Sequence, residues 1–320
     1  MNYALVFPGQ GAQEVGMGRE LFEKYAAARE VFEKTDEALG FSLSRVIFEG
    51  PEDELTRTEN AQPAILAVSI ATKNVVEHEL GCPLNPVLVA GHSLGEYTAL
   101  VAAGTLSLED GIRLVHLRGK WMQEAVPVGA GSMAAILGLE PDLVRQSCEE
   151  ASEGEICSPA NFNAPGQVVI SGHANAVARA VEAARRLGAK KAIPLKVSAP
   201  FHCGLMEPVA ERLYEAFKGC SWKRPSCPLV NNVYATLISD PEEIRQALRK
   251  QTFSPVRWYE SVLEMEKKGV REYLEIGPGN VLSGLVRKGS RQAITYDTSS
   301  TGNLEKMLTA LREGEDGAIG

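Results

Sequence analysis

The segment at residues 87–104, VLVAGHSLGEYTALVAAG, constrains the fold more than any other stretch because it joins two kinds of secondary structure around one serine. Residues 87–90 form a short apolar run with β-branched side chains, which is typical of a buried parallel strand. The residues after the Gly-x-Ser-x-Gly pattern are free of proline and favour a helix. The sequence therefore places Ser93 on a turn between a strand and a helix.

The turn around Ser93 has the features of a nucleophile elbow. In such an elbow the serine occupies a strained turn above the sheet, and flanking glycines let the strand and the helix approach closely. The start of the helix also directs unpaired backbone N–H groups and a partial positive charge towards an oxyanion formed at the serine. A Gly/Ser turn without chemistry is the alternative, but strand, elbow and helix together favour a catalytic serine.

Apolar periodicity elsewhere indicates a parallel sheet with crossover helices. We expect a strand at 3–7, amphipathic helix within 19–39 and a buried helix at 63–80, ahead of the Ser93 strand. Beyond residue 200 the pattern predicts a helix at 205–217, a strand at 228–235, helical segments up to 268, a strand at 271–277 and a helix at 280–288. The tail at 312–320 is expected to be disordered.

Between residues 132 and 197 the pattern changes to β-α-β-β-α-β, the order of a split βαβ, ferredoxin-like unit. We expect strands at 132–139, 155–162, 167–172 and 190–197, and helices at 141–151 and 174–188. Because this unit interrupts the larger α/β pattern, we expect hinges at 127–131 and 198–200. The predicted organisation is a discontinuous domain of residues 1–126 and 198–320 with a small domain, 127–197, inserted into it.

Composition is that of an ordinary globular protein with one large core or two domains, since 44% of the 320 residues are hydrophobic and 23% are charged. The net charge of −8 argues against general binding to nucleic acid or to an anionic membrane. No leader-like start and no apolar run near the ~20 residues of a membrane span are present, so we expect a cytoplasmic protein. Six cysteines without C-x-x-C or metal-ligand spacing predict reduced thiols and no metal site.

A serine nucleophile needs a base, and His202 is the strongest candidate among the five histidines. It lies in the loop where the chain returns from the predicted insertion, and cleft residues are expected at such junctions. The other histidines fit surface, capping or elbow positions: His78, His92, His116 and His173. The acidic residues considered as a third member lie after Ser107 or in the insertion. We therefore predict a Ser–His dyad whose imidazole is held by a neutral acceptor.

The helix predicted at 107–126 places one arginine where burying its charge is energetically unfavourable. On a helical wheel Arg118 falls in the middle of the apolar arc, between Leu114 and Met122. A buried guanidinium is tolerated only when it is paired, because desolvating an isolated charge costs several kcal/mol or more. The partner is either a buried acidic residue or a substrate carboxylate, which the planar guanidinium binds through two parallel hydrogen bonds. The wheel alone leaves both possibilities open.

Seven motifs, in order along the chain, carry a resemblance to a known family: FPGQGAQ, AGHSLGEYTAL, RGKWMQEAV, SPANFNAPGQVVISG, SAPFHCGLM, PLVNNV and EIGPGNVLSGL. With them the sequence closely resembles bacterial malonyl-CoA:acyl carrier protein transacylases over nearly its whole length. The resemblance implies an α/β-hydrolase-like large domain with a parallel sheet and a ferredoxin-like insertion. It also implies malonyl transfer from coenzyme A to the phosphopantetheine thiol of acyl carrier protein, through a malonyl-serine intermediate and without a cofactor, in fatty-acid biosynthesis.

The same resemblance implies a role for each matching position. It matches Ser93 to the nucleophile, His202 to the base and Arg118 to the residue that binds the malonyl carboxylate. The other matched positions are Gln10 and Leu94 for the oxyanion hole, Gln62 and Phe201 for the substrate site, and Gln251 for the acceptor that orients the histidine. Ala61 is a small departure, since many members have threonine there, and it leaves Gln62 available to line the site.

Malonyl-CoA and acyl carrier protein are the expected partners of a monomeric enzyme. Acyl carrier proteins are acidic, so an acidic enzyme must meet one with a local positive patch. The candidate pairs are Lys190 with Lys191 and Arg287 with Lys288, and solvated surface pairs without a partner are the alternative. A serine thioesterase or esterase, a non-catalytic scaffold that binds acyl carrier protein, and a transacylase of a polyketide pathway remain open on the sequence alone.

Overall fold

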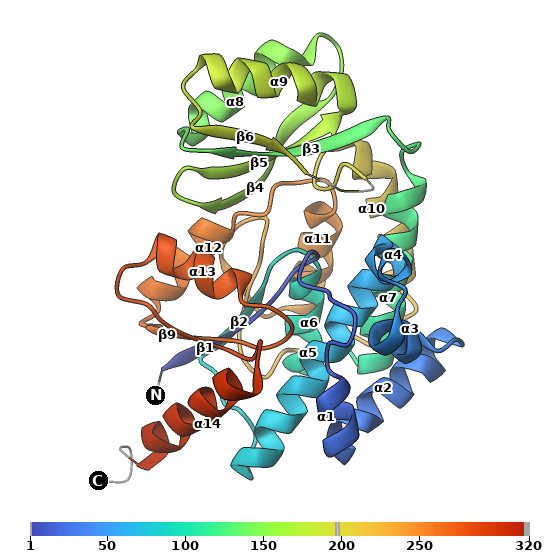
Figure 1. Ribbon diagram of the computed structural model, residues 1–320, viewed down its shortest axis with the longest axis vertical. Helices are drawn as coiled ribbons and strands as arrows, with labels where there is room; N and C mark the ends of the chain where they lie inside the picture. The colour runs from blue at the N-terminus through green and yellow to red at the C-terminus, as the bar shows by residue number, and fades with distance from the viewer. Residues whose placement is uncertain (1, 196, 198, 317–320) are drawn as a thin grey trace.

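The computed structural model describes residues 2–195, 197 and 199–316 and contains two separate sheets (Figure 1). The larger sheet and most helices occupy the lower part of Figure 1, and a small sheet with two helices lies at the top. This arrangement confirms the predicted fold class, an α/β fold with a mainly parallel sheet and a separate ferredoxin-like unit. The limits predicted for the two domains stay a prediction.

The larger sheet has six strands in the order β10-β9-β1-β2-β7-β8. Their bounds are β1 (Tyr3–Phe7), β2 (Leu88–Gly91), β7 (Leu229–Val230), β8 (Leu237–Ile238), β9 (Glu272–Glu275) and β10 (Ile294–Asp297). All neighbouring strands pair in parallel except β8, which pairs with β7 in the antiparallel direction. Parallel neighbours require crossover connections, which the helices supply, as the alternating sequence pattern predicts.

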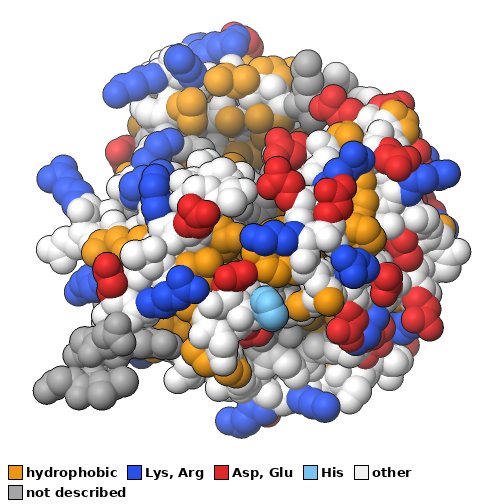
Figure 2. All heavy atoms as spheres, turned by 60° about the horizontal axis from the view of Figure 1, so that its bottom comes forward, with side chains coloured by type: hydrophobic (Ala, Val, Ile, Leu, Met, Phe, Trp, Pro, Cys, Tyr) orange, Lys and Arg blue, Asp and Glu red, His pale blue; other side chains and the backbone are white. Residues whose placement is uncertain are grey.

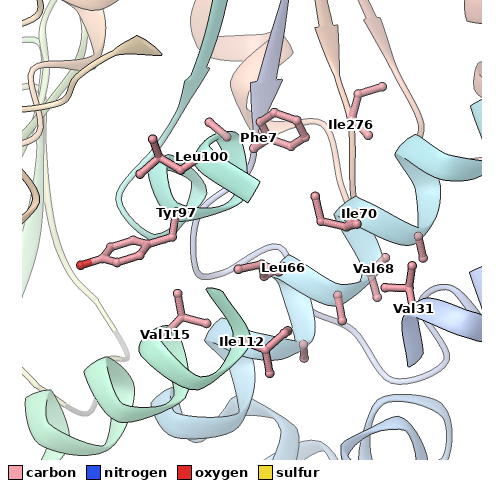
Figure 3. Close-up of a cluster of buried hydrophobic side chains, with 14 of the residues drawn as sticks. Phe7, Val31, Leu66, Val68, Ile70, Tyr97, Leu100, Ile112, Val115 and Ile276 are labelled. Carbon is pink, nitrogen blue, oxygen red and sulfur yellow. The ribbon is translucent and has the colours of Figure 1, made fainter. Parts of the chain in front are cut away.

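The helices of this part are α1 (Arg19–Lys24), α2 (Ala26–Leu39), α3 (Leu43–Glu49), α4 (Glu52–Thr56), α5 (Thr58–Leu80), α6 (Leu94–Ala102), α7 (Leu108–Glu124), α10 (Glu207–Phe217), α11 (Pro241–Gln251), α12 (Trp258–Lys267), α13 (Val281–Gly289) and α14 (Thr301–Asp316). They cover both faces of the sheet, so β1 is buried at every residue. Leu5 and Phe7 of β1 join a large core cluster with α2, α5 and α6, whereas Ala4 and Val6 join a second cluster with α12 and α13. Figure 3 shows the first cluster between the sheet and α5. This alternation is the two-residue period of a strand buried on both faces.

The small sheet has the strand order β4-β5-β3-β6 and is antiparallel throughout. Its elements are β3 (Gly131–Leu137), α8 (Pro141–Ser152), β4 (Cys157–Ala164), β5 (Gln167–His173), α9 (Ala174–Arg186) and β6 (Lys191–Pro194). They follow the predicted β-α-β-β-α-β order, but β4 begins and ends two residues later than expected and β6 ends at Pro194. Residues 196 and 198, within the predicted last strand and second hinge, lie outside the described residues.

A short parallel bridge joins the small sheet to the segment between α11 and α12. Phe162 N donates to Val256 O and Val256 N donates to Ala160 O, each over 2.9 Å. These bonds fix the end of β4 against the lower part of the molecule. They therefore hold the small sheet in one orientation relative to the segment that carries Ser93.

Two predicted elements were wrong in their extent. The buried helix begins at Thr58 rather than Pro63, so Pro63 lies inside α5. Proline there cannot donate to Glu59 O, and the freed carbonyl instead lies 2.9 Å from His116 Nδ1. The strand predicted at 228–235 is only two residues long, because the Asn231 side chain bonds to Thr236 O and turns the chain back into β8.

The end of the chain was also predicted wrongly, since residues 312–316 are helical rather than disordered. Residues 317–320 lie outside the described residues. Arg312 Nη2 donates to Glu79 O over 2.8 Å, which attaches the last turn of α14 to α5. The apolar side chains that α14 adds to the large core cluster are Leu304, Met307, Leu308 and Leu311. The sequence analysis missed this apolar face and the strand β10 that precedes it.

Candidate active site

Ser93 lies at the turn between β2 and α6, with φ 55° and ψ −108°, a strained conformation for a residue other than glycine. A Cβ atom at Gly91 would lie 1.9 Å from Gly95 O, and one at Gly95 would lie 2.2 Å from Phe7 O. Side chains at either position would overlap backbone, so this turn requires glycine on both sides of the serine. Ser93 N donates to Asn232 Oδ1 over 2.8 Å, which supports the strained residue from a distant segment.

His202 lies directly against this serine. Ser93 Oγ is 2.7 Å from His202 Nε2, and His202 Nδ1 is 2.8 Å from the main-chain oxygen of Gln251. Because a carbonyl oxygen can only accept, Nδ1 carries the ring proton and Nε2 can accept the Ser93 hydroxyl proton. The acceptor that faces the imidazole is therefore neutral. His202 is 3% exposed and also has a positive φ, 59°.

Burial and, to a smaller extent, the nearby Arg118 cation lower the pKa of His202 to about 3. The imidazole is therefore neutral at ordinary pH and available as a base. The other histidines have different neighbours: His92 lies against Asn163, His116 against Glu59 O, His173 against Ile156 N and His78 against Tyr25. Among the described residues, none of these four hydrogen-bonds to Ser93.

Arg118, on α7, is 1% exposed, and its guanidinium points at the serine. Nη1 donates to Gln62 Oε1 over 2.8 Å, while Nη2 donates to Gln251 Oε1 over 3.0 Å and to Ser93 Oγ over 3.1 Å. Within the described part of the chain, Nε–H has no hydrogen-bond partner and the guanidinium forms no salt bridge. A direct ion pair with a buried acidic residue, one of the two possibilities that the helical wheel left open, is therefore absent from the described part of the chain. A buried guanidinium with an unused donor is suited to a carboxylate ligand.

Ser93, His202 and Arg118 line one cavity of about 370 Å³. Four further residues matched from the sequence line it: Gln10, Gln62, Leu94 and Phe201. Leu94 is the first residue of α6, so its N–H has no acceptor within the helix and is available to an oxyanion. Gln10 lies on the loop after β1, and its side chain donates to Thr58 Oγ1 over 3.3 Å. The small sheet supplies further lining through Met133 and Asn161.

The sequence analysis missed Glu96, a completely buried acidic residue in the first turn of α6. Its Oε2 accepts from Gln251 Nε2 over 2.9 Å and from Asn232 N over 3.0 Å. Burial raises the pKa of Glu96 to about 7, although both hydrogen bonds and the charge of Arg118 oppose this rise. An acidic residue three positions after the serine, on an otherwise apolar helix, was the available signal.

Asn232 was missed as well. Its Oδ1 accepts from Ser93 N and its Nδ2 donates to Gly91 O over 2.7 Å, so one side chain holds both ends of the elbow. The available signal was the Asn-Asn pair that ends the apolar run of PLVNNV. Asn161 of β4, which is 7% exposed and lines the cavity, was also not identified from the sequence.

The basic residues considered for docking are all exposed and lie outside the cavity lining: Lys190, Lys191, Arg287 and Lys288. Lys288 Nζ donates to Gln167 Oε1 over 3.1 Å, at the start of β5. The Lys190 side chain packs beside Gly138, whose N–H donates to Gly166 O over 2.7 Å. The two pairs therefore flank the same end of the small sheet. On the face shown in Figure 2, Lys and Arg side chains are interspersed with Asp and Glu.

Within the described part of the chain, no cluster of three or more His, Cys, Asp or Glu side chains could hold a metal ion. Nor does any described helix have the length and apolar character needed to cross a membrane. The six cysteines form no disulfide.

Comparison with known proteins decides the family. The acyl transferase domain family matches residues 4–316. The malonyl CoA-acyl carrier protein transacylase of Bacillus subtilis (strain 168) is 47% identical over 316 residues, 98% of this chain and 99% of the relative. The chain belongs to this transacylase family. The enzyme of the same name from Escherichia coli (strain K12) is 46% identical over 287 residues, 90% of this chain and 92% of the relative.

Two solved structures agree with this membership. An acyl carrier protein S-malonyltransferase from Vibrio cholerae superposes with a TM-score of 0.92 at 43% identity, over 96% of this chain and all of the other. A type II PKS acyl-carrier protein in complex with its malonyl-transacylase, PlMCAT:AntF, gives 0.93 at 44% identity, over 97% of this chain and all of the other.

Proposed function

We propose that this protein moves a malonyl group from malonyl-CoA to the phosphopantetheine thiol of acyl carrier protein, in fatty-acid biosynthesis. The observation that carries the proposal is the position of Arg118, a buried cation that lines the cavity of the Ser93–His202 pair and forms no salt bridge among the described residues. Its Nη2 lies 3.1 Å from Ser93 Oγ, so a carboxylate bound there keeps a nearby thioester carbonyl within reach of the serine. The names of the relatives point to the same acyl group.

Acylation begins at the hydrogen bond between the dyad residues. His202 Nε2 takes the proton of Ser93 Oγ, and the oxygen attacks the thioester carbonyl of malonyl-CoA. The N–H groups of Gln10 and Leu94 stabilise the oxyanion of the tetrahedral intermediate. When the intermediate collapses, the C–S bond breaks and His202 protonates the leaving thiolate of coenzyme A. The malonyl group remains as an ester on Ser93, and the carrier thiol reverses these steps. A thioester is already an activated acyl group, so the proposal requires no cofactor.

Arg118 also affects the base. Its charge, which has no directly bound anion in the described part of the chain, lowers the pKa of His202 and so opposes the imidazolium that acylation forms. A malonyl carboxylate pairs with Arg118 directly, beside Ser93 and His202, and so offsets that charge at the base, which raises the basicity of His202 when the correct substrate is bound. An acetyl group has no carboxylate and leaves the guanidinium without a directly bound anion. The proposed site therefore discriminates between acyl groups in the chemical step as well as in binding.

The test is the intact mass of the protein after incubation with malonyl-CoA alone. We expect one malonyl adduct, mapped to Ser93, with one coenzyme A released, and no adduct on Ser93→Ala. Added acyl carrier protein should remove the adduct and become malonylated. Release of free malonate as fast as carrier acylation would instead indicate a thioesterase, and a folded protein that never forms an adduct would indicate a binding scaffold.

We propose that the four basic residues Lys190, Lys191, Arg287 and Lys288 dock the acidic carrier protein. Support comes from their exposure and from their position around one end of the small sheet. Reversing their charges should raise KM for the carrier and weaken its salt dependence, while KM for malonyl-CoA stays unchanged. Each basic pair is also reversed alone, and reversal of the pair Arg185 and Arg186, on α9, is the control matched in charge to either one. Equal losses for both substrates would contradict the docking role.

We further propose that residues 127–197 form a small domain inserted between 1–126 and 198–320, and that the enzyme is a cytoplasmic monomer. Every strand of the small sheet lies between residues 131 and 194, which supports these limits. Light scattering should give the chain mass of 34.5 kDa. Twice that mass in dilute solution would contradict the monomer.

A further inference from the structure

The buried charge of Arg118 has a second buried group close to it that the proposed mechanism does not use. Glu96 is completely buried, and its carboxylate does not touch the guanidinium directly. The side-chain amide of Gln251 lies between the two. Its Oε1 accepts from Arg118 Nη2 over 3.0 Å, and its Nε2 donates to Glu96 Oε2 over 2.9 Å.

This amide bridge lets Glu96 compensate the charge of Arg118 without occupying it. A direct bidentate salt bridge would occupy two donors that a substrate carboxylate needs, whereas the amide bridge uses one Nη2–H, and Nε–H has no partner among the described residues. The attraction between the two charges remains substantial, because neither group is exposed to solvent. Without Glu96, the guanidinium of the free enzyme would be an isolated buried charge.

The two oxygens of Glu96 have different environments. Oε2 accepts both hydrogen bonds, from Gln251 and Asn232, whereas Oε1 has no partner within the described part of the chain. A proton can therefore bind Oε1 without breaking either hydrogen bond. The carboxyl group can change its charge while it continues to hold Asn232 and Gln251 in place.

The titratable groups around Glu96 keep the same charge near pH 7. Arg118, from α7, is the cation that faces it, and Tyr97, on its own helix, stays protonated because burial raises its pKa. His202, on the loop that faces Ser93, and His92, in the elbow itself, are neutral because burial lowers the pKa of both. Burial sets the pKa of Glu96 itself at about 7. Glu96 is therefore the group of this cluster that can change charge at physiological pH.

We propose that Glu96 is the counter-ion of Arg118 in the free enzyme and that it takes up one proton from solvent when the malonyl carboxylate takes over this function. The inference rests on the proposed function of the site. Two carboxylates close to one guanidinium repel each other, so the second raises the pKa of the first. Protonation of Glu96 on Oε1 restores the neutral total charge of the site, and the proton returns to solvent when the malonyl group leaves. Glu96 is a positioning residue, since it contacts neither substrate nor reacting atoms.

The proposal predicts a specific pH dependence. Protonated Glu96 is the form that accepts malonyl, so kcat/KM for malonyl-CoA should fall as pH rises through about 7. The protonated fraction falls about tenfold between pH 6 and pH 8 for such a group, and kcat/KM should fall by up to the same factor. Acetyl-CoA shares the titrating groups of coenzyme A but has no carboxylate, so its kcat/KM should not show this fall.

The experiment compares the pH profiles of the two acyl donors in wild type, Glu96→Gln and Glu243→Gln. Glutamine at position 96 imitates the protonated carboxyl group, so the malonyl profile should lose its step near pH 7 and approach the acetyl profile. Glu243 is exposed on α11, the helix that carries Gln251, and its variant changes the net charge by the same amount. We expect that control to retain the wild-type profile. Parallel profiles for the two donors in wild type, or a step that persists in Glu96→Gln, would overturn the proposal.

A second measurement does not depend on the stability of a variant. The infrared difference spectrum of malonylated minus free wild-type enzyme at pH 8, with ¹³C-labelled malonyl-CoA, should gain the band of a protonated carboxyl group. Absence of that band on fully malonylated enzyme would overturn the proton uptake. Failure of malonyl-CoA to acylate the enzyme would overturn the proposed function, whereas normal transfer without the band or the pH step refutes only the role of Glu96.

Discussion

Replacement of Arg118 by alanine tests the selectivity of the site most directly. The guanidinium is 1% exposed, so a malonyl carboxylate bound to it in the proposed site would be removed from water together with it. Loss of one partner from such a desolvated, hydrogen-bonded charge pair typically costs ~2–5 kcal/mol, or roughly 30- to 4000-fold. We therefore expect kcat/KM for malonyl-CoA to fall within that range. For acetyl-CoA it should rise in absolute terms, because the variant has no guanidinium that an acetyl group leaves without a direct partner and none to oppose the imidazolium.

The same substitution has a structural cost that must be measured separately. Without the guanidinium, Gln62 Oε1 and Gln251 Oε1 lose the donors that they have in the wild type. Each buried acceptor left without a partner costs about 1–3 kcal/mol unless water replaces the donor. Lys120→Ala, at an exposed position of the same helix, is the control for the change in helix composition.

The assay is kcat/KM for both acyl donors beside a thermal melt of each variant. A folded Arg118→Ala enzyme should show a reversed or strongly reduced preference for malonyl. If it melts like the wild type and keeps the wild-type ratio of malonyl to acetyl transfer, Arg118 does not bind the substrate carboxylate. Equal loss of both activities in a destabilised protein would instead assign Arg118 a purely structural role.

Three further perturbations have defined outcomes. Gly95→Ala should lower both stability and activity, because its Cβ would lie 2.2 Å from Phe7 O, whereas Gly302→Ala should be neutral in both, since its Cβ meets no atom within 4 Å. Leu308→Ala should cost about 2–3 kcal/mol in a urea unfolding titration if α14 belongs to the core, and no loss would contradict that packing. The pKa of His202 is about 3 in the folded protein and about 6.5 in the unfolded chain, so the unfolded chain binds the proton first as pH falls. Stability should therefore decrease on acidification below about pH 6.5, and His202→Gln should reduce this decrease.

The parts of the site that could be predicted from sequence are those whose signal is local. The elbow follows from an apolar strand, two glycines and a proline-free helix within one segment, and the observed overlaps at Gly91 and Gly95 give the physical reason for that pattern. The burial of Arg118 follows from the period of its own helix. His202 was chosen because it follows the predicted insertion, and the structure has a separate four-stranded sheet at that place in the chain.

The parts that were missed depend on which distant segment meets the elbow. Asn232 holds Ser93 from the turn that follows the two-residue strand β7, and this turn is set by the side chain of Asn231 rather than by periodicity. The apolar face of α14 was overlooked because the chain ends in a polar, glycine-rich stretch at 312–320. The earlier turns of the helix nevertheless pack on the core. Composition gives the average polarity of a segment, whereas the packing of a helix depends on the residues of one face.

The acceptor that orients His202 illustrates a limit of another kind. It is a main-chain carbonyl, which every residue possesses, so no residue type at position 251 could have revealed it without a resemblance. The side chain of Gln251 performs a separate task, since it bridges Arg118 to Glu96 and also donates to Ser93 O over 2.9 Å. One residue therefore connects the orientation of the base, through its backbone, with the charge of the proposed carboxylate receptor, through its amide. A shift of α11 would therefore disturb the orientation of His202 and the amide bridge at Arg118 together.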